Sequence, residues 1–307
     1  MLKNFRLWVR IMLGMGVAIA FAVAALTYSN LRNMEAVIGE AERAELRQHV
    51  EAILVSVAAE TRMAEALSAL VANLPEVQAR FAAGDRDWLQ AQLLPAYKAL
   101  ETGYGAVQFQ FHTPPAWSFL RLHLIGKHGD DLSSFRHSVV DANTQIKPQR
   151  GLEVGVGDLG ARGMVPVSYQ GKHLGSVEFG MSFGQSFFAA FKKNYGVDAG
   201  LHILRNDGFT TFASTYGDKP LLDPAALQAA FAGKPQLADT TLNGKPMAIY
   251  AAVVNDYSGK PLGVVEVAMD PTRYQQALRQ ATRQAWLTGV LALLFGLGVT
   301  WLIAHAL

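Results

Sequence analysis

The chain has 307 residues, half of them hydrophobic, and a formal net charge of +2. So small a charge argues against nucleic acid as a partner, because nucleic-acid binding needs a strongly basic surface. Since the chain has no cysteine, it can form no disulfide, no thiolate metal site and no c-type haem attachment.

Two uncharged apolar segments lie near the ends of the chain, at residues 11–31 and 285–307. At about 1.5 Å per residue, either segment would cross the roughly 30 Å hydrocarbon layer as a helix. Lys3, Arg6 and Arg10 precede the first segment and predict a cytoplasmic N-terminus. We therefore expect a two-pass protein of the bacterial inner membrane, with the intervening region periplasmic or extracellular. A cleaved signal peptide is the alternative interpretation of the first segment.

Residues 31–74 carry apolar side chains at helical spacing, for example Met34, Ile38, Leu46 and Val50, and contain almost no helix breaker. This pattern predicts a helix of about 60 Å that emerges directly from the membrane. Part of that helix should pack along its own domain. Its membrane-proximal half also fits packing against a second copy, which predicts a homodimer.

Alternating strands follow this helix. In "YGAVQFQFH" and "SFLRLHL" apolar and polar residues alternate, which predicts two strands with one face of each kind. The segment "DDLSSFRHSVVDANTQ" predicts a helix with Asp130 or Asp131 as its N-cap. The glycine-rich "RGLEVGVGDLGARG" predicts a flexible loop over a pocket, followed by the strands "MVPVSY" and "LGSVEFGMS".

The last hairpin of this unit occurs twice. "YQGKHLGSVEFG" begins at Tyr169 and "YSGKPLGVVEVA" begins 88 residues later, so that Glu178 corresponds to Glu266. The second copy also has strands and a helix in the same order, with Asp223 as the expected N-cap of the helix "PAALQAAFAG". The sequence thus predicts two related α+β units in tandem, too few for a solenoid.

This arrangement resembles the double Cache sensor region of bacterial methyl-accepting chemotaxis proteins and sensor kinases. The resemblance rests on the two apolar helices, the long helix, the tandem units and the segment from Phe111 to Gly180. It implies two PAS-like (Cache) modules that receive a ligand and signal through the membrane. Such a receptor would continue into a cytoplasmic signalling module, which is absent from this chain and leaves the output class open.

With this resemblance, the chain divides into seven expected segments. They are a cytoplasmic N-terminus (1–10), a transmembrane helix (11–31), a long membrane-proximal helix (32–75), a membrane-distal Cache module (76–185), a membrane-proximal Cache module (186–273), a helical connector (274–284) and a second transmembrane helix (285–307).

The polar face of the first module is the expected ligand site. The candidate ligand-binding residues are Gln108, Gln110, His112, Trp117, Arg121, His123, Arg162 and Glu178. Arg121 matters most, because a guanidinium matches a carboxylate with two hydrogen bonds, and Trp117 could form an aromatic wall. Alternatively, Arg121 could pair with Glu153, Asp158 or Glu178 in a structural salt bridge.

Two other kinds of site carry less weight. Five of the eight histidines fall between residues 112 and 173, but no compact metal motif such as HExxH is present, and we expect neither a metal nor a cofactor. The second module, where we expect a mainly mechanical role, could form a small pocket from His202, Asp207, Tyr250, Asp256 and Tyr257.

These observations favour an extracytoplasmic sensor of a small, anionic ligand over an enzyme. An accessory membrane protein that binds another protein through its long helix is the alternative. A metal-dependent hydrolase built on the histidines is a third hypothesis, which elemental analysis would test.

Overall fold

A computed structural model describes residues 7–155, 158–206 and 208–306. The chain forms two compact units. One comprises the chain up to Glu45 together with the chain from Asp270 onward, and the other is Leu46–Met269. The first unit is helical and the second contains both sheets, which gives the mixed α+β composition expected from the sequence.

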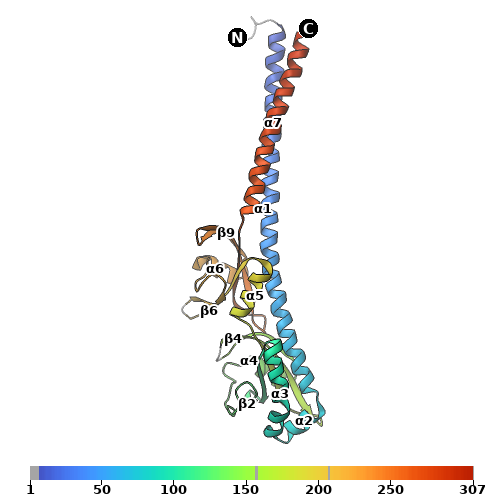
Figure 1. Cartoon of the computed structure of the whole chain (residues 1–307), viewed down its shortest axis with the longest axis vertical. Coiled ribbons are helices and arrows are strands. Elements are labelled where there is room, and N and C mark those ends of the chain that lie inside the picture. Colours follow the sequence, from blue (N-terminus) through green and yellow to red (C-terminus); the bar gives the residue numbers. More distant parts are fainter. Residues whose placement is uncertain (1–6, 156–157, 207, 307) are drawn as a thin grey trace. The chain divides into compact units, whose positions relative to one another are not determined.

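Two helices make up the first unit, namely the first part of α1 (Leu7–Ala72) and α7 (Thr272–Ala306). Both are long and apolar enough to cross a membrane. They run side by side within this unit (Figure 1). A Cβ added at Gly289 of α7 would lie 2.8 Å from the hydroxyl of Thr27, and one at Gly296 would lie 2.7 Å from Ile19. Small residues therefore allow the two backbones to approach closely.

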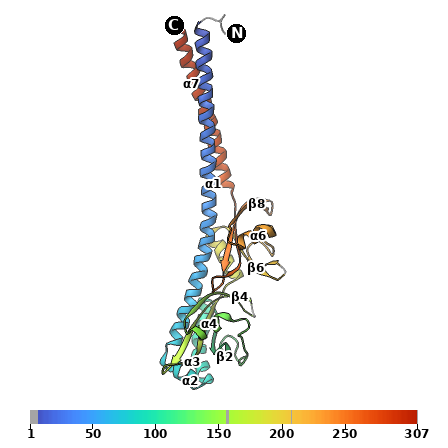
Figure 2. The same ribbon diagram turned by 180° about the vertical axis from the view of Figure 1, so that it is seen from behind.

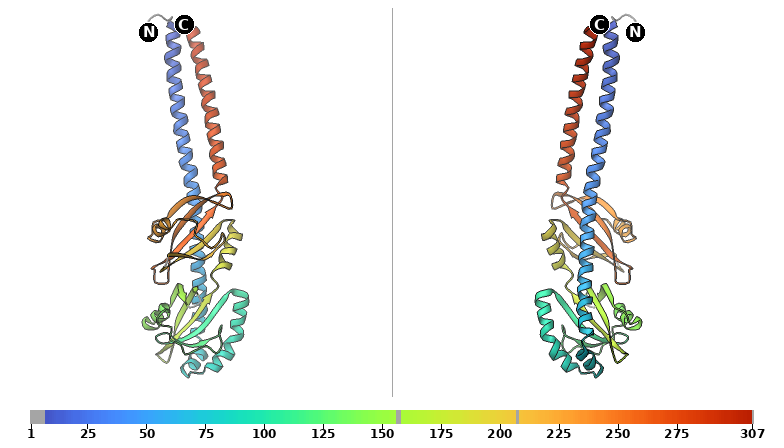
Figure 3. Two further views of the ribbon diagram at one scale, coloured as in Figure 1. Left: turned by 90° about the vertical axis from the view of Figure 1, so that its left-hand side faces the viewer. Right: turned by 90° about the vertical axis from the view of Figure 1, so that its right-hand side faces the viewer.

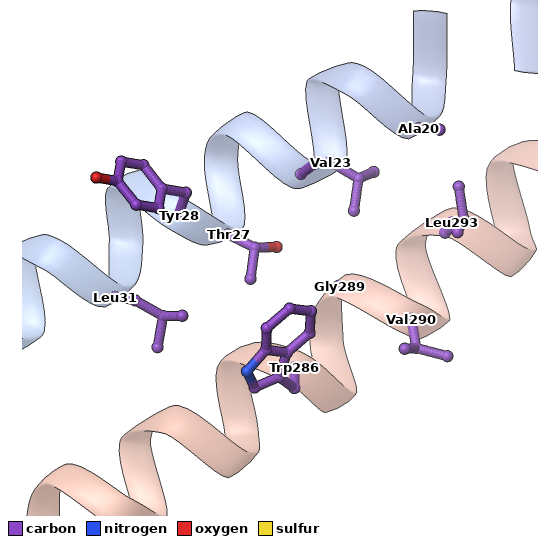
Figure 4. Close-up of a pocket in the computed structure, with 10 residues that line it drawn as sticks. Ala20, Val23, Thr27, Tyr28, Leu31, Trp286, Gly289, Val290 and Leu293 are labelled. Carbon is purple, nitrogen blue, oxygen red and sulfur yellow. The ribbon is translucent and has the colours of Figure 1, made fainter. Parts of the chain in front are cut away.

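An apolar pocket of about 230 Å³ interrupts this seam. Val23, Thr27 and Leu31 of α1 point across it toward α7 (Figure 4). Trp286 and Val290 line the other side. The lining is almost entirely hydrocarbon, which fits contact with lipid or with another apolar surface.

The second unit contains two five-stranded antiparallel sheets, drawn mainly in green and in orange in Figure 3. The strands of the first sheet are β1 (Ala106–Thr113), β2 (Trp117–Arg121), β3 (Gln149–Gly155), β4 (Asp158–Tyr169) and β5 (Lys172–Met181). Those of the second are β6 (Asp198–Arg205), β7 (Gly208–Ser214), β8 (Gln236–Leu242), β9 (Lys245–Asn255) and β10 (Pro261–Met269). Their orders, β2-β1-β5-β4-β3 and β7-β6-β10-β9-β8, are equivalent, which confirms the tandem repeat.

The repeated glycines explain part of this equivalence. Gly175 on β5 and Gly263 on β10 are 88 residues apart, and a Cβ at either would overlap a backbone carbonyl oxygen of the neighbouring strand. The carbonyl belongs to His112 in the first sheet and to His202 in the second. Glycine is thus required in both hairpins because the strands approach too closely there for any side chain.

Helices cover one face of the first sheet with an aromatic core. Besides α1, they are α2 (Pro75–Ala82) and α3 (Arg86–Tyr104), and α3 starts from the N-cap Asp85. The ring of Phe109 stacks on that of Phe179 at 4.0 Å, and Phe111 meets Phe81 of α2 at 5.4 Å. This side of the sheet is therefore a close-packed apolar core.

The other face of each sheet is covered by a shorter helix, α4 (His137–Gln145) on the first and α6 (Pro224–Phe231) on the second (Figure 2). As expected, the carboxylate of Asp223 caps α6 by accepting a hydrogen bond from the backbone N–H of Ala226. The two modules are joined by α5 (Gln185–Tyr195).

Two local predictions are wrong. Neither Asp130 nor Asp131 caps α4, which starts only at His137 after the N-cap Arg136. The two carboxylates have other partners, Arg121 for Asp130 and the backbone and hydroxyl of Ser133 for Asp131. These contacts hold residues 130–133 outside the helix.

The glycine-rich segment is also not a loop, because its described part forms the strands β3 and β4. Its glycines permit close contacts instead of flexibility. A Cβ at Gly163 would overlap the backbone of Glu65 on α1. The backbone of α1 therefore lies directly on β4, where Ser68 donates a hydrogen bond of 2.8 Å to the carbonyl of Gly163.

Candidate ligand-binding site

The face of the first sheet under α4 is polar and buried. Its central residue is Glu178 on β5, whose side chain is fully buried. Its Oε1 atom accepts hydrogen bonds from Arg136 at 2.6 Å and from Arg162 at 3.0 Å, and Oε2 accepts one from Gln110 at 3.0 Å. Although burial alone would raise the pKa of Glu178, the two guanidinium groups lower it to about 2. Glu178 is thus an anion held by two buried cations.

Both arginines have a second partner on this face. Arg136, just before α4, donates to Glu153 of β3 at 2.9 Å, and Glu153 also accepts from the backbone N–H of Ser138 at 2.8 Å. Arg162 of β4 donates to Gln108, while its Nε atom has no partner among the described residues. Burial, and then the charge of Arg136, lowers the pKa of Arg162. The cluster therefore has one buried donor that lacks an acceptor.

A row of unpaired polar side chains lies beside this cluster. His112 on β1 is directly opposite Ser118 on β2 and Ser176 on β5. All three are at most 2% exposed. Within the described part of the chain, neither serine hydroxyl and neither ring nitrogen of His112 has a hydrogen-bond partner, and the same is true of Oδ1 of Asn143 on α4. Each such group costs on the order of 1–3 kcal/mol, so the row is a place where polar atoms of a ligand or water would be stabilising.

His112 is neutral in this environment. Its Nε2 atom lies 3.5 Å from Oε2 of Glu178, a distance that would form an ion pair only if the ring were protonated. Burial dominates over the attraction of Glu178 and lowers the pKa of His112 to about 3. The contact with Glu178 is accordingly not an ion pair near neutral pH.

Arg121 lies at the edge of the polar face and holds a carboxylate with two hydrogen bonds. Its Nη1 and Nη2 atoms donate to the two oxygens of Asp130, both at 2.8 Å. Asp130 is not one of the three partners expected from the sequence. Two of those, Glu153 and Glu178, bind Arg136 instead. The side chain of the third, Asp158, lies outside the described residues. Arg121 is only 8% exposed, whereas the side chain of Asp130 is 41% exposed. The partner of this buried cation is thus a carboxylate at the surface.

The polar face contains more buried positive groups than buried carboxylates. Three guanidinium groups, those of Arg121, Arg136 and Arg162, are at least nine-tenths buried, but among the described side chains of this cluster only Glu153 and Glu178 are buried carboxylates. The third negative charge comes from Asp130, which reaches Arg121 from the loop after β2. The loop therefore supplies the anion that the buried part of the site lacks.

The structure brings together six of the eight candidate residues on the buried polar face. They are Gln108, Gln110, His112, Arg121, Arg162 and Glu178. Trp117 begins β2 and is 43% exposed. His123 follows β2, where its Nδ1 atom lies 3.3 Å from the backbone N and O of Phe109. The described residues contain no cluster of three histidine or acidic side chains that could hold a metal ion.

Sequence reasoning did not single out four residues of this face, namely Arg136, Ser138, Ser118 and Ser176. Arg136 lies inside the segment that the sequence predicts as a helix, but α4 starts only after it. Ser118 and Ser176 lie on predicted strands and Ser138 lies in the predicted helix, and nothing in the spacing distinguishes their buried hydroxyls from exposed ones. The repeat was the available signal for Ser176, since it is two residues before Glu178 in the duplicated hairpin.

The second module fills the equivalent position with its own groups. Glu266 on β10 accepts hydrogen bonds from the backbone N–H groups of Leu221 at 2.9 Å and Leu222 at 3.0 Å. It also accepts one from the hydroxyl of Tyr216 at 2.7 Å and contacts His202 at 3.1 Å. His202 is opposite Val264, as His112 is opposite Ser176, so both His–Glu pairs occupy equivalent positions. In the second module, groups of the chain itself therefore occupy the surroundings of the equivalent glutamate.

The small pocket expected in the second module is not formed as a group. His202 lies in the closed network with Glu266, whereas the hydroxyl of Tyr257 donates to Asp141 of the first module at 2.8 Å. Asp256 accepts hydrogen bonds within its own turn, from Ser258 and Lys260. Asp207 lies outside the described residues.

The two sheets and the polar face define a sensory region built from two PAS-like modules. Residues 39–274 match the family described as the double sensory domain of two-component sensor kinases, dCache_3, and the chain belongs to this family. Such sensory regions lie outside the cytoplasm in membrane receptors. A comparison with curated protein sequences gives no match.

Similar solved structures come from kinases and chemoreceptors. The extracellular domain of vpHK1S-Z8, described as a histidine kinase, has a TM-score of 0.53 at 12% identity, covering 78% of this chain and 98% of that one. The sensor domain of the V. cholerae histidine kinase DctB has a TM-score of 0.46 at 11% identity, covering 78% and 98%. That of the Campylobacter jejuni chemoreceptor Tlp3 with isoleucine bound has 0.42 at 13% identity, covering 83% and 98%.

The neutral, buried His112 predicts that acid destabilises the protein. Between pH 6.5, the ordinary pKa of histidine, and about pH 3, the unfolded chain binds a proton at this position and the folded chain does not. The free energy of unfolding should fall with decreasing pH by up to about 1.4 kcal/mol per pH unit from this group. Glu178 adds to this loss below about pH 4.5, since its folded pKa is lowered to about 2.

Thermal unfolding at several pH values checks this expectation. His112→Asn should unfold at a temperature that depends less on pH between 6.5 and 4 than that of the wild-type protein. His137→Asn, which alters an exposed histidine at the start of α4, is the matched control and should keep the wild-type slope. An unchanged slope in His112→Asn would contradict the assignment.

Proposed function

We propose that the chain is the sensory part of a membrane receptor and that its first module binds a small anionic molecule. The observation that carries this proposal is the charge arrangement of the polar face. A buried guanidinium, Arg121, is neutralised by Asp130, a partly exposed carboxylate on a loop. A carboxylate ligand can make the same two hydrogen bonds to Arg121 that Asp130 makes.

Ligand binding would then be an exchange of carboxylates. The ligand takes the place of Asp130 on Arg121, and the loop that carries Asp130 is released. That loop is attached to β2 through the backbone, since Gly129 donates to the carbonyl of Ser118 at 2.7 Å. The exchange therefore changes the edge of the first sheet, and it gives the ligand different affinities for the two states, as any ligand-driven switch requires.

The rest of the ligand would lie along the unpaired row. His112, Ser118, Ser176 and Asn143 offer both donors and acceptors without partners, and they lie on the same face as Arg121. A molecule that combines one carboxylate with further hydrogen-bonding groups fits this set of residues. The row would distinguish among carboxylates, because a ligand without those groups leaves the side chains unsatisfied.

A thermal-shift screen of the full chain with amino acids, hydroxy acids and dicarboxylates tests the exchange. Asp130→Asn weakens the internal competitor, so an active carboxylate should bind it about tenfold more tightly than it binds the wild-type protein. Arg121→Gln should lose the response. Asp131→Asn is the control, because the carboxylate of Asp131 accepts its hydrogen bonds from Ser133 in its own turn. If no carboxylate stabilises the wild-type protein, or Arg121→Gln responds normally, the proposal fails.

A contact between the modules offers the signal a route toward the membrane. Tyr257 lies at the tip of the repeated hairpin in the second module. Its hydroxyl donates a hydrogen bond of 2.8 Å to the carboxylate of Asp141 on α4. Its backbone N–H donates to the carbonyl of Leu152 on β3 at 3.0 Å, and a Cβ at Gly151 would overlap the backbone of Tyr257. Burial and the neighbouring Asp141 raise the pKa of Tyr257, which keeps the hydroxyl protonated.

This contact connects the cover of the ligand site with the second membrane helix. α4 carries Asp141 and follows directly on Arg136, which binds Glu178. The hairpin of Tyr257 continues into β10, and the chain passes from β10 into α7. In the proposed mechanism, a shift of α4 caused by the ligand pulls on Tyr257 and is carried by β10 to α7.

Tyr257→Phe should separate binding from transmission. The variant keeps the polar face, so an active carboxylate should bind with an affinity within about threefold of the wild-type value. In a chain that carries Thr27→Cys and Gly289→Cys, an active carboxylate should change the rate of disulfide formation. Tyr257→Phe should abolish this change. The measurement is simple because the chain has no cysteine of its own. Tyr169→Phe changes the equivalent tyrosine of the first hairpin and should behave like wild type. Equal cross-linking responses in both variants would exclude this route.

We also propose that the chain works as a homodimer in a bacterial inner membrane, with both modules outside the cytoplasm. The positive residues before the first apolar segment support this orientation. Val55, Met63 and Leu70 of α1 are 69%, 50% and 64% exposed and recur at intervals of eight and seven residues. Ala59 and Ala66 lie between them, which gives the helix an apolar stripe suited to a second helix.

Cross-linking through a single introduced cysteine tests the dimer. Ala59→Cys in the apolar stripe should form a disulfide-linked dimer in membranes, whereas Arg47→Cys, exposed on the same helix, should not. Adding Met63→Glu to Ala59→Cys should lower the cross-linked fraction severalfold, because a charge would be buried in the interface. Cross-linking to a different protein instead of a second copy would favour an accessory role for the long helix.

A further inference from the structure

A separate pocket of about 380 Å³ lies away from the polar face, where α1, the end of α3 and α5 meet. Glu60 of α1 is the only charged residue among those that line it. The carboxylate is partly buried and has no hydrogen bond or ion pair to any described residue. Burial raises the pKa of Glu60 above its usual range.

Aromatic rings form much of the remaining wall. Tyr104 ends α3, and Phe187, Phe191 and Tyr195 come from successive turns of α5. The rings of Phe191 and Tyr195 lie 4.5 Å apart. The faces of such rings attract cations, most strongly those that are weakly hydrated.

The end of α3 adds to the negative potential of this pocket. Tyr104 is the last residue of that helix and Gly105 is its C-cap, and both line the pocket. The last turn of α3 carries no basic residue that would offset the partial negative charge of a helix C-terminus. The carboxylate and the aromatic rings favour a cationic ligand, and the C-terminus of α3 offsets the opposite partial charge of the first turn of α5, which also lines the pocket.

Neighbouring basic groups do not supply that charge. Lys192 of α5 forms an ion pair with Asp198 at 2.6 Å. His49 packs edge-on against Phe191 and Tyr195, and burial lowers its pKa, which favours the neutral ring. Glu60 is therefore left to a cation from solution.

We propose that this pocket binds a small organic cation, a protonated amine or a quaternary ammonium ion. The cation pairs with Glu60 and lies against the rings of Tyr104, Phe187 and Tyr195. Because α5 joins the two modules and α1 runs beside it, the bound cation connects elements of the sensory unit that the anionic ligand does not reach. This site is independent of the exchange at Arg121, and either can exist without the other.

Saturation-transfer NMR with tetramethylammonium tests the proposal on the full chain in dodecyl maltoside micelles, a detergent without ammonium groups. The methyl protons should receive saturation from the wild-type protein. Glu60→Gln should weaken binding about tenfold, and Tyr195→Leu about fivefold, since Tyr195 is exposed and contributes only its ring face. Glu51→Gln, an exposed glutamate on the same helix, is the matched control and should bind like wild type.

A neutral probe of similar shape, tert-butanol, separates charge recognition from apolar binding. It should compete with tetramethylammonium only at much higher concentration. Equal binding of both probes, or equal binding of tetramethylammonium to wild type and to Glu60→Gln, would overturn the proposal. An intact thermal unfolding transition in Glu60→Gln confirms that the variant is folded, so that a loss of binding is attributable to the carboxylate.

Discussion

The buried carboxylate of Glu178 is the interaction on which the first module depends. A carboxylate that is fully removed from water is strongly unfavourable unless cations and donors surround it. Here the donors come from three directions: Gln110 on β1, Arg162 on β4 and Arg136 before α4. The neighbouring strands and the cover of the sheet must therefore be in place together, which links the position of α4 to the state of the polar face.

The second module meets the same constraint in a different way. Glu266 occupies the position of Glu178, but its partners are backbone N–H groups and the hydroxyl of Tyr216. A Cβ at Gly200 would lie 2.6 Å from that hydroxyl, so the glycine makes room for the tyrosine. Apolar residues such as Leu227 and Ile249 fill the rest of this face. Two copies of one unit have thus diverged: one keeps unpaired polar groups beside its glutamate, and the other satisfies its glutamate within the chain.

Much of this organisation could be predicted from the sequence because it is periodic or repeated. The alternation around Phe109 and Phe111 predicted the apolar face, and the spacing of 88 residues predicted the equivalence of Glu178 and Glu266. Contacts that depend on tertiary structure could not be predicted. An aspartate before a helical pattern predicts a helix N-cap. Predicting the pairing of Asp130 with Arg121 instead requires the strand order and the bulge between Phe111 and His112. From the sequence, the glycines of β3 and β4 predict flexibility, since the sequence does not show which backbone they approach.

The pairing of Arg121 with Asp130 has a consequence for affinity in the proposed mechanism. Asp130 is tethered close to the guanidinium, and a tethered group competes at an effective concentration on the order of millimolar or more. A free carboxylate that offers only the same two hydrogen bonds would therefore replace it only at comparable concentrations. Binding at lower concentrations needs additional contacts, and the unpaired groups of His112, Ser118 and Ser176 are the ones available on this face. In the proposed mechanism, Arg121 thus selects the charge of the ligand, whereas the row beside it determines which carboxylate binds and how tightly.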